Sequence, residues 1–147
     1  MKPIAISCGE PAGIGPEIAV EAWKTLKDDI PLLWIGDPRH LPADTDVAIL
    51  NDPQDAITGK FNVLAQDFGP QNTPGMANPD HAQGVINAIS TGVELVQAGQ
   101  ARAICTAPIH KAALIDGADF AYPGHTEYLA ALAKTDRVVM MLSLIHI

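Results

Sequence analysis

Three short motifs contain the side chains in this sequence whose types and spacing could do chemistry. They are residues 9–17 (GEPAGIGPE), residues 106–111 (TAPIHK) and residues 123–127 (PGHTE). Each motif follows an apolar run typical of a buried strand or stands at the start of a helical pattern. Open parallel sheets bind ligands at the carboxyl ends of their strands, beside the amino ends of helices. We therefore expect the three motifs to share one edge of a sheet.

The glycine-rich motif at 9–17 matches neither of the familiar phosphate-binding loops. The dinucleotide fingerprint requires a third glycine where Ile18 stands, and the P-loop requires a lysine that does not follow Gly15. A tight strand-to-helix turn is an equally good interpretation. We hypothesise that Gly13 or Gly15 adopts a backbone conformation barred to other residues, or lets a ligand approach the backbone closely.

The other two motifs offer a lysine and two histidines. Lys111 could pair with a phosphate or carboxylate as a point charge, although a solvated lysine beside a surface histidine at His110 is the commoner arrangement. His125 could donate to an anionic oxygen or transfer a proton. Thr126 is the expected cap of the helix that follows. A lone histidine near a helix start is more often structural, so His125 gains weight only from its position beside the other motifs.

The remaining histidines and the cysteines lie outside these motifs. His40 and His81 are predicted to be surface residues, and His146 receives no role. Cys8 and Cys105 lie near the carboxyl ends of predicted strands, where a buried small apolar side chain is the default interpretation. Two thiols without a CxxC spacing predict neither a disulfide framework nor a zinc site.

Apolar runs and helical periodicity place the elements that must position these motifs. Asn78, Pro79 and Asp80 form a typical capped helix start. Strands that alternate with helices predict an α/β fold, with a parallel-type sheet and flanking helices. The predicted strands are residues 2–7, 32–36, 47–50, 62–65, 101–106 and 138–142, and the predicted helices are residues 15–27, 80–98, 111–115 and 127–133.

Length, composition and charge exclude several classes of protein. The chain has 147 residues, enough for one modest domain, with 48% hydrophobic and 18% charged residues. Its formal net charge is −8, and nucleic acid or an anionic membrane surface requires clustered lysine and arginine instead. The N-terminal apolar run is too short for a signal peptide, and no run approaches the ~18 apolar residues of a membrane span. We therefore expect a cytoplasmic protein without a nucleic-acid or membrane partner.

Taken together, the motifs resemble those of the 4-hydroxythreonine-4-phosphate dehydrogenase family of vitamin B6 biosynthesis. The segments that occur in the family's order and spacing are residues 9–17, 106–111, 123–127 and 138–142 (VVMML). The resemblance runs from residue 2 to about residue 142. Residues 1–142 are accordingly expected to be the N-terminal portion of a two-domain dehydrogenase. The tail at 143–147 (SLIHI) differs from the family and is expected to be non-native or truncated.

The resemblance implies a fold like that of isopropylmalate dehydrogenases, with two α/β domains and a cleft between them. It implies oxidation of a secondary alcohol on a small phosphorylated substrate, 4-phosphohydroxy-L-threonine, by NAD or NADP, followed by loss of carbon dioxide. A divalent metal (Mg, Zn or Co) would polarise the reacting oxygens as a Lewis acid. The complete enzyme is expected to be a homodimer.

Carried over by position, His125 and Thr126 match the family's substrate-binding His-Thr pair. The family's three metal-binding histidines and its phosphate-binding Lys, Asn and Arg lie beyond residue 147, so no metal ligand is assigned. His110 stands where many relatives have Asn, and Lys111 is not assigned as the catalytic lysine. The catalytic and cofactor-binding residues stay unknown, and the chain alone is expected to be inactive. Two alternatives stay open: a family relative acting on a phosphorylated sugar acid or a dihydrodiol, and a non-catalytic small-molecule-binding α/β module.

Overall fold

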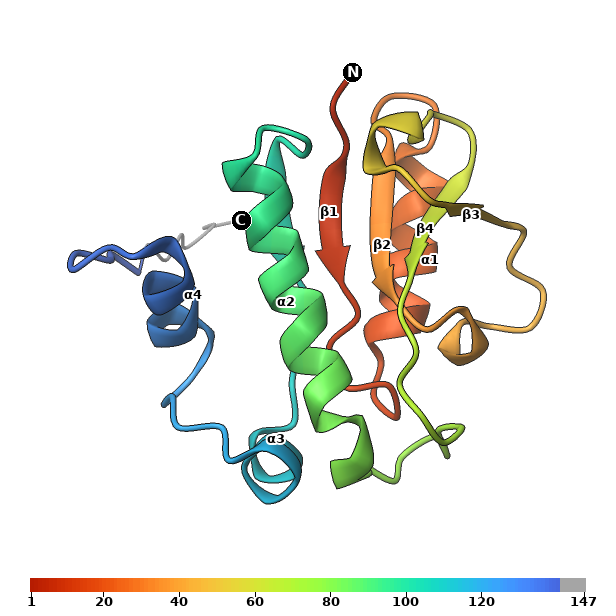
Figure 1. Cartoon of the computed structure of the whole chain (residues 1–147). Coiled ribbons are helices and arrows are strands. Elements are labelled where there is room, and N and C mark those ends of the chain that lie inside the picture. The colour runs from red at the N-terminus through yellow and green to blue at the C-terminus, as the bar shows by residue number, and fades with distance from the viewer. Residues whose placement is uncertain (141–147) are drawn as a thin grey trace, which may run out of the picture.

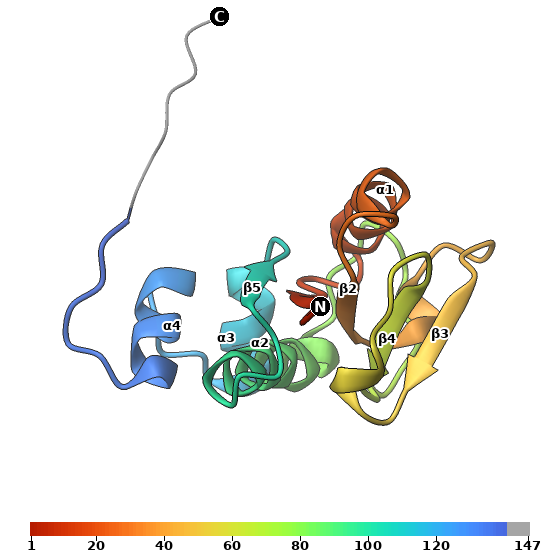
Figure 2. The same ribbon diagram turned by 90° about the horizontal axis from the view of Figure 1, so that it is seen from above.

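The computed structural model describes residues 1–140, which form a parallel sheet with helices on both faces (Figures 1 and 2). The strands are β1 (Ile4–Ser7), β2 (Leu32–Gly36), β3 (Val47–Leu50), β4 (Phe61–Ala65) and β5 (Ala103–Thr106). The helices are α1 (Gly15–Leu26), α2 (Ala82–Gln97), α3 (Lys111–Ala118) and α4 (His125–Ala133), with short 3-10 turns at Pro38–His40, Pro53–Asp55 and Pro79–His81. The predicted α/β fold with a parallel-type sheet and flanking helices is confirmed.

The strand order β3-β4-β2-β1-β5 places a reversal of direction at β1. The chain leaves β1 through α1 to reach β2 on one side, and later crosses through α2 to reach β5 on the other side. Figure 2 shows α1 over one face of the sheet and α2 over the opposite face. Ser7 and Thr106, the last residues of β1 and β5, are paired neighbours. Doubly wound sheets bind their ligands beyond such a reversal, at the carboxyl ends of the strands.

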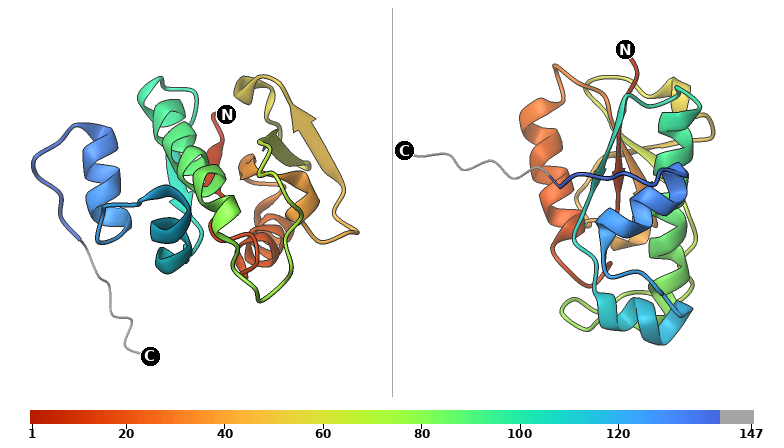
Figure 3. Two further views of the ribbon diagram at one scale, coloured as in Figure 1. Left: turned by 60° about the horizontal axis from the view of Figure 1, so that its bottom comes forward. Right: turned by 90° about the vertical axis from the view of Figure 1, so that its left-hand side faces the viewer.

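Burial on both faces explains the sequence of the central strands. Every residue of β2 is buried, including Trp34 at 0% exposure, because helices cover the sheet on both sides. The exposed side of α2 is polar, as the helical spacing of its buried Val85, Ile89 and Val93 predicts. Figure 3 shows α4 lying beside α2, with α3 near the end at which α2 begins.

The predicted helix starts are confirmed where a cap or a proline marks them. The Asn78 side chain accepts a hydrogen bond from the Asp80 amide at 3.0 Å, and the turn that follows leads directly into α2. Pro16 opens α1, with Glu17 in the first turn. The ends of α3 and α4 were less well predicted: α3 continues to Ala118, and α4 begins at His125, two residues before the predicted start.

The predicted strand at 138–142 is wrong for its described part. Val138, Val139 and Met140 form no strand and are 49%, 83% and 66% exposed. A strand satisfies its backbone groups by pairing with a neighbour, and these three residues pair with none of residues 1–137. Residues 141 and 142 and the tail at 143–147 lie outside the described residues.

Three predictions of exposure or burial are also wrong. His40 and His81 are buried, at 6% and 1% exposure, because the turns that carry them fold inward onto Phe68. Cys105 is exposed because it lies on β5, an edge strand of the sheet. Cys8 is buried as predicted, and burial raises the pKa of its thiol far above the ordinary range.

Candidate functional site

The first two motifs are in direct contact at the carboxyl edge of the sheet. The amide of Glu10 donates a hydrogen bond to the carbonyl oxygen of Pro108 at 2.8 Å. Gly9 has a φ of 66°, and a Cβ atom there would overlap the same Pro108 oxygen. The turn after β1 therefore packs against the turn after β5, as the expected common edge requires.

The hypothesis about Gly13 and Gly15 is wrong in its first part, because neither has a positive φ. Gly15 is instead required by a close approach of the chain itself. A Cβ atom at Gly15 would overlap the carbonyl oxygen of Cys8 and lie 3.2 Å from the Cβ of Ala107. The protein's own backbone fills the space beside Gly9 and Gly15, so the turn does not fit a dinucleotide cradle.

A segment from a distant part of the sequence holds the outer side of the glycine turn. The side-chain amide of Asn72 donates to the Pro11 carbonyl at 2.7 Å, and the Gly75 amide donates to the Ala12 carbonyl at 2.8 Å. On the inner side, the buried Glu10 carboxylate accepts from the Ala12 amide at 3.0 Å. We call residues 66–78, between β4 and the turn before α2, the strap. Nothing in the local sequence around Asn72 indicated this role.

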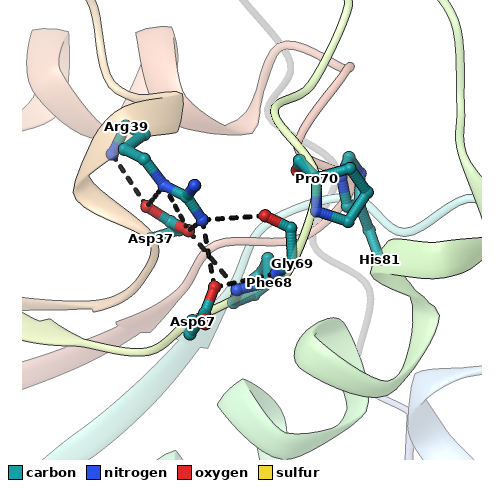
Figure 4. Close-up of polar contacts among 7 residues, drawn as sticks. All are labelled: Asp37, Arg39, Asp67, Phe68, Gly69, Pro70 and His81. Carbon is teal, nitrogen blue, oxygen red and sulfur yellow. Dashed lines mark hydrogen bonds and ion pairs between the residues drawn. The ribbon is translucent and has the colours of Figure 1, made fainter.

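A cluster of charged side chains, with His81 beside it, anchors the beginning of the strap (Figure 4). The guanidinium of Arg39 donates to the Asp37 carboxylate, to Asp67 at 3.0 Å and to the Gly69 carbonyl at 3.0 Å. Burial would raise the pKa of Asp37, but hydrogen bonds from Arg39 and from the Phe68 amide outweigh burial and lower this pKa to about 2.

The buried His81 fixes the next residue of the strap. Its Nε2 donates a hydrogen bond to the Pro70 carbonyl at 2.8 Å, and its ring centroid lies 5.3 Å from that of His40. Burial lowers the pKa of His40, and neither ring nitrogen of His40 has a hydrogen-bond partner among the described residues. The two histidines therefore belong to the packing that supports the strap, away from the three motifs.

The second motif is joined to the third by Lys111. The Lys111 ammonium is exposed and donates one hydrogen bond within the chain, to the carbonyl oxygen of Pro123 at 2.7 Å. His110 is exposed as expected, and its Nδ1 accepts from the Ala113 amide at 3.2 Å. His110 thereby caps α3 and has a structural role.

The third motif places His125 and Thr126 in the first turn of α4. The N-cap residue is Gly124, and no side chain caps the helix, so the prediction that Thr126 is the cap is wrong. The helix begins before Thr126, which leaves the threonine hydroxyl free of a capping bond. His125 is half-buried, and burial lowers the pKa of its imidazole. Its Nε2 is closed to solvent and has no partner among residues 1–140.

Two contacts link the three motifs, beginning at the carboxyl edge where the strand order reverses. The Pro108 contact joins the glycine turn to the second motif, and the Lys111–Pro123 contact joins the second motif to the third. A half-buried imidazole, a threonine hydroxyl and the amino end of α4 can together hold an anionic oxygen.

The described residues do not form a metal centre by themselves. Among residues 1–140, no three His, Cys, Asp or Glu side chains converge in a way that could hold a metal ion. None of these side chains is therefore assigned as a metal ligand. In the same part of the chain, no helix is long and apolar enough to cross a membrane.

Comparison with known proteins identifies close relatives of the sequence. Residues 23–146 match the model of the family described as pyridoxal phosphate biosynthetic protein PdxA. The chain is 59% identical over 145 residues to a 4-hydroxythreonine-4-phosphate dehydrogenase of Roseobacter denitrificans, and 58% identical over 143 residues to that of Ruegeria sp.. These alignments cover 96% and 95% of this chain but 44% of each relative, so the chain spans less than half of their length.

Solved structures share the fold. A 4-hydroxythreonine-4-phosphate dehydrogenase from Burkholderia phymatum matches with a TM-score of 0.86 and 31% identity, covering 98% of this chain and 47% of that one. The Klebsiella pneumoniae enzyme matches with a TM-score of 0.81 and 30% identity, over 91% and 45% of the two chains. A terephthalate 1,2-cis-dihydrodiol dehydrogenase from Burkholderia xenovorans matches with a TM-score of 0.68 and 23% identity, covering 91% of this chain and 41% of that one. This match shows a shared fold alone. Because the family model spans most of the sequence, the chain belongs to the pyridoxal phosphate biosynthetic protein PdxA family.

Proposed function

We propose that this chain is the N-terminal part of an enzyme that oxidises and decarboxylates 4-phosphohydroxy-L-threonine in pyridoxal phosphate biosynthesis. Relatives named 4-hydroxythreonine-4-phosphate dehydrogenase, at 59% and 58% identity, support this substrate. Because the chain spans 44% of their length, the activity is proposed for the complete protein. That protein would use NAD or NADP and a divalent metal, and would act in the cytoplasm as a homodimer. None of residues 1–140 is assigned to hold the cofactor or the metal.

The observation that carries the proposal is that His125 and Thr126 open α4, in a motif that Lys111 links to the turn after β5 at the carboxyl edge of the sheet. Both lie in the first turn of α4, where the helix dipole favours an anionic oxygen. Burial lowers the pKa of His125, which favours a neutral imidazole that donates one hydrogen bond. The Thr126 hydroxyl supplies a second donor.

Replacing His125 tests the proposal. In the complete enzyme, His125→Ala should lower kcat/KM by about 10- to 150-fold, because a hydrogen bond to a charged group contributes roughly 1.5–3 kcal/mol. The measurement is NAD(P)H absorbance with 4-phosphohydroxy-L-threonine below KM. Thr126→Val should lower kcat/KM in the same direction, and Thr135→Val, beyond the end of α4, is its matched control. An unchanged kcat/KM in His125→Ala would remove His125 from the site.

A substrate panel separates this function from its alternatives. A family member acting on a phosphorylated sugar acid or a dihydrodiol would form NAD(P)H with that compound and not with 4-phosphohydroxy-L-threonine. The similarity to the dihydrodiol dehydrogenase lies at 23% identity, whereas the relatives that bear the proposed name reach 59%. A non-catalytic binding module would form NAD(P)H with none of these compounds.

A further inference from the structure

We propose that Lys111 is a positioning residue for His125. Its ammonium holds the loop between α3 and α4 through the carbonyl of Pro123, and thereby sets where the imidazole stands at the start of α4. The inference rests on the proposed function, in which His125 binds the substrate.

The local helix does not explain a lysine at this position. Lys111 is the first residue of α3, where the positive end of the helix dipole disfavours a cation. The start of α3 is already capped, because His110 Nδ1 accepts the Ala113 amide. A residue type that is unfavourable at its position in a helix is expected to make a favourable contact with another part of the protein. The contact that Lys111 makes elsewhere is the 2.7 Å hydrogen bond to Pro123.

The Pro123 carbonyl is a point from which the position of His125 can be controlled. Only Gly124 separates the two residues, and it is the N-cap of α4, with an extended backbone and no side-chain capping bond. One turn later, Tyr128 packs against Phe120 and Tyr122, with ring centroids 5.2 and 5.0 Å apart. The aromatic contacts hold α4 in place, and Lys111 holds the loop that leads into His125, the first residue of α4.

The environment of His125 indicates that something holds the ring in place. Its Nε2 is closed to solvent and unpaired among the described residues, which is unfavourable for a polar atom. A free loop would let the ring turn toward water. Burial is the cause that lowers the pKa of His125, without a contribution from a neighbouring charge. Lys111 therefore acts on His125 through position and not through its charge.

Histidine titration by NMR tests this role directly in the 147-residue chain. Lys111→Met keeps most of the side-chain length and removes the donor, whereas Lys111→Arg keeps a cationic donor. Lys60→Met is the matched control, because Lys60 is exposed and precedes β4, which lies three strands away from β5 in the sheet. We expect Lys111→Met to raise the pKa of His125 toward its ordinary value of about 6.5. Lys111→Arg should restore the lowered pKa, and Lys60→Met should leave it unchanged.

Three results would overturn the inference. The first is a His125 titration that is the same in Lys111→Met and in the unchanged chain. The second is a change in the pKa of the buried His40 together with that of His125, which would mean that Lys111 supports the whole fold. The third is a Lys111→Arg variant that titrates like Lys111→Met, which would mean that the donor is not what matters.

Kinetics of the complete enzyme provide a second and separable test. Lys111→Met should lower kcat/KM by about 10-fold, within what a displacement of about 1 Å can cost. In a His125→Ala background it should add almost nothing, because the two changes would act on one contact. Independent, additive losses would overturn the positioning role. If His125→Ala alone has no effect on kcat/KM, His125 is removed from the proposed substrate site, while the NMR titration still decides whether Lys111 positions the ring.

Discussion

The glycines of the turn after β1 differ in how tightly the chain surrounds them. Gly15 is buried and its missing Cβ would overlap the Cys8 carbonyl, whereas Gly13 is exposed and its nearest neighbour, the Glu10 carbonyl oxygen, would lie 3.3 Å away. The motif looked like a ligand cradle in the sequence because glycine serves both purposes. The structure assigns Gly15 to packing of the chain on itself.

Substitution of the two glycines distinguishes packing from an ordinary turn. Gly15→Val should lower the free energy of unfolding by about 1–3 kcal/mol or more, because overpacking forces the backbone to shift. Gly13→Ala, the matched control, should change it by less than about 1 kcal/mol. Urea unfolding followed by circular dichroism measures both. Equal stability of the two variants would show that the turn can open without cost.

At the scale of elements, the strap holds the glycine turn through contacts between residues far apart in the sequence. Hydrogen bonds from Arg39 and His81 hold its beginning, and those of Asn72 and Gly75 hold the glycine turn. Asn72→Ala should lower the free energy of unfolding by about 0.5–1.5 kcal/mol and speed hydrogen exchange at the Gly75 amide. Asn51→Ala, at an exposed position, is the control. Unaltered exchange at Gly75 would mean that the strap holds without Asn72.

The histidine under the strap should make stability depend on pH. Burial lowers the pKa of His40; Asp37 opposes this shift, whereas His81 and Arg39 add to it. Because the folded-state pKa is below the unfolded value, the unfolded chain binds the proton more readily. The contribution of neutral His40 to the free energy of unfolding is therefore complete above about pH 6.5 and is lost as the pH falls below that value. Asp37, with a pKa of about 2, loses its own contribution only in a separate window below about pH 4.

Replacing His40 isolates its share of this dependence. The free energy of unfolding should fall between pH 7 and pH 5 in the unchanged chain and fall less in His40→Leu, which cannot bind a proton. His125, whose pKa burial also lowers, accounts for part of the remaining slope. Denaturant unfolding at a series of pH values provides the measurement. Identical slopes in the two chains would exclude His40 as a source.

For the whole molecule, we expect the 147-residue chain alone to be inactive. Alcohol oxidation assisted by a metal requires several protein donors on one centre, and residues 1–140 bring no such group together. The test follows NAD(P)H absorbance with 4-phosphohydroxy-L-threonine and added Mg²⁺, Zn²⁺ or Co²⁺, beside the Roseobacter denitrificans relative as a positive control. Turnover that chelation abolishes would contradict the expectation and place a metal site within this chain.

Local pattern and chain topology determined most of the fold. Apolar runs located the five strands to within two residues at their starts, and Asn78 and Pro16 marked the beginnings of the long helices. The three motifs could be assigned to one edge because parallel strands all end on the same side of a sheet. The segment at 138–140 failed because an apolar run is only a candidate strand until a neighbour pairs with it.

Only the tertiary structure decided which side chains meet. The Asn72 side chain donates to the Pro11 carbonyl, 61 residues away in the sequence. The local sequence around neither residue predicts this hydrogen bond. The burial of His40 and His81 and the exposure of Cys105 depend on what covers a turn or an edge strand, which local periodicity does not encode. Likewise the sequence placed Lys111 beside His110, but its contact with Pro123 exists because the loop between α3 and α4 returns to the start of α3.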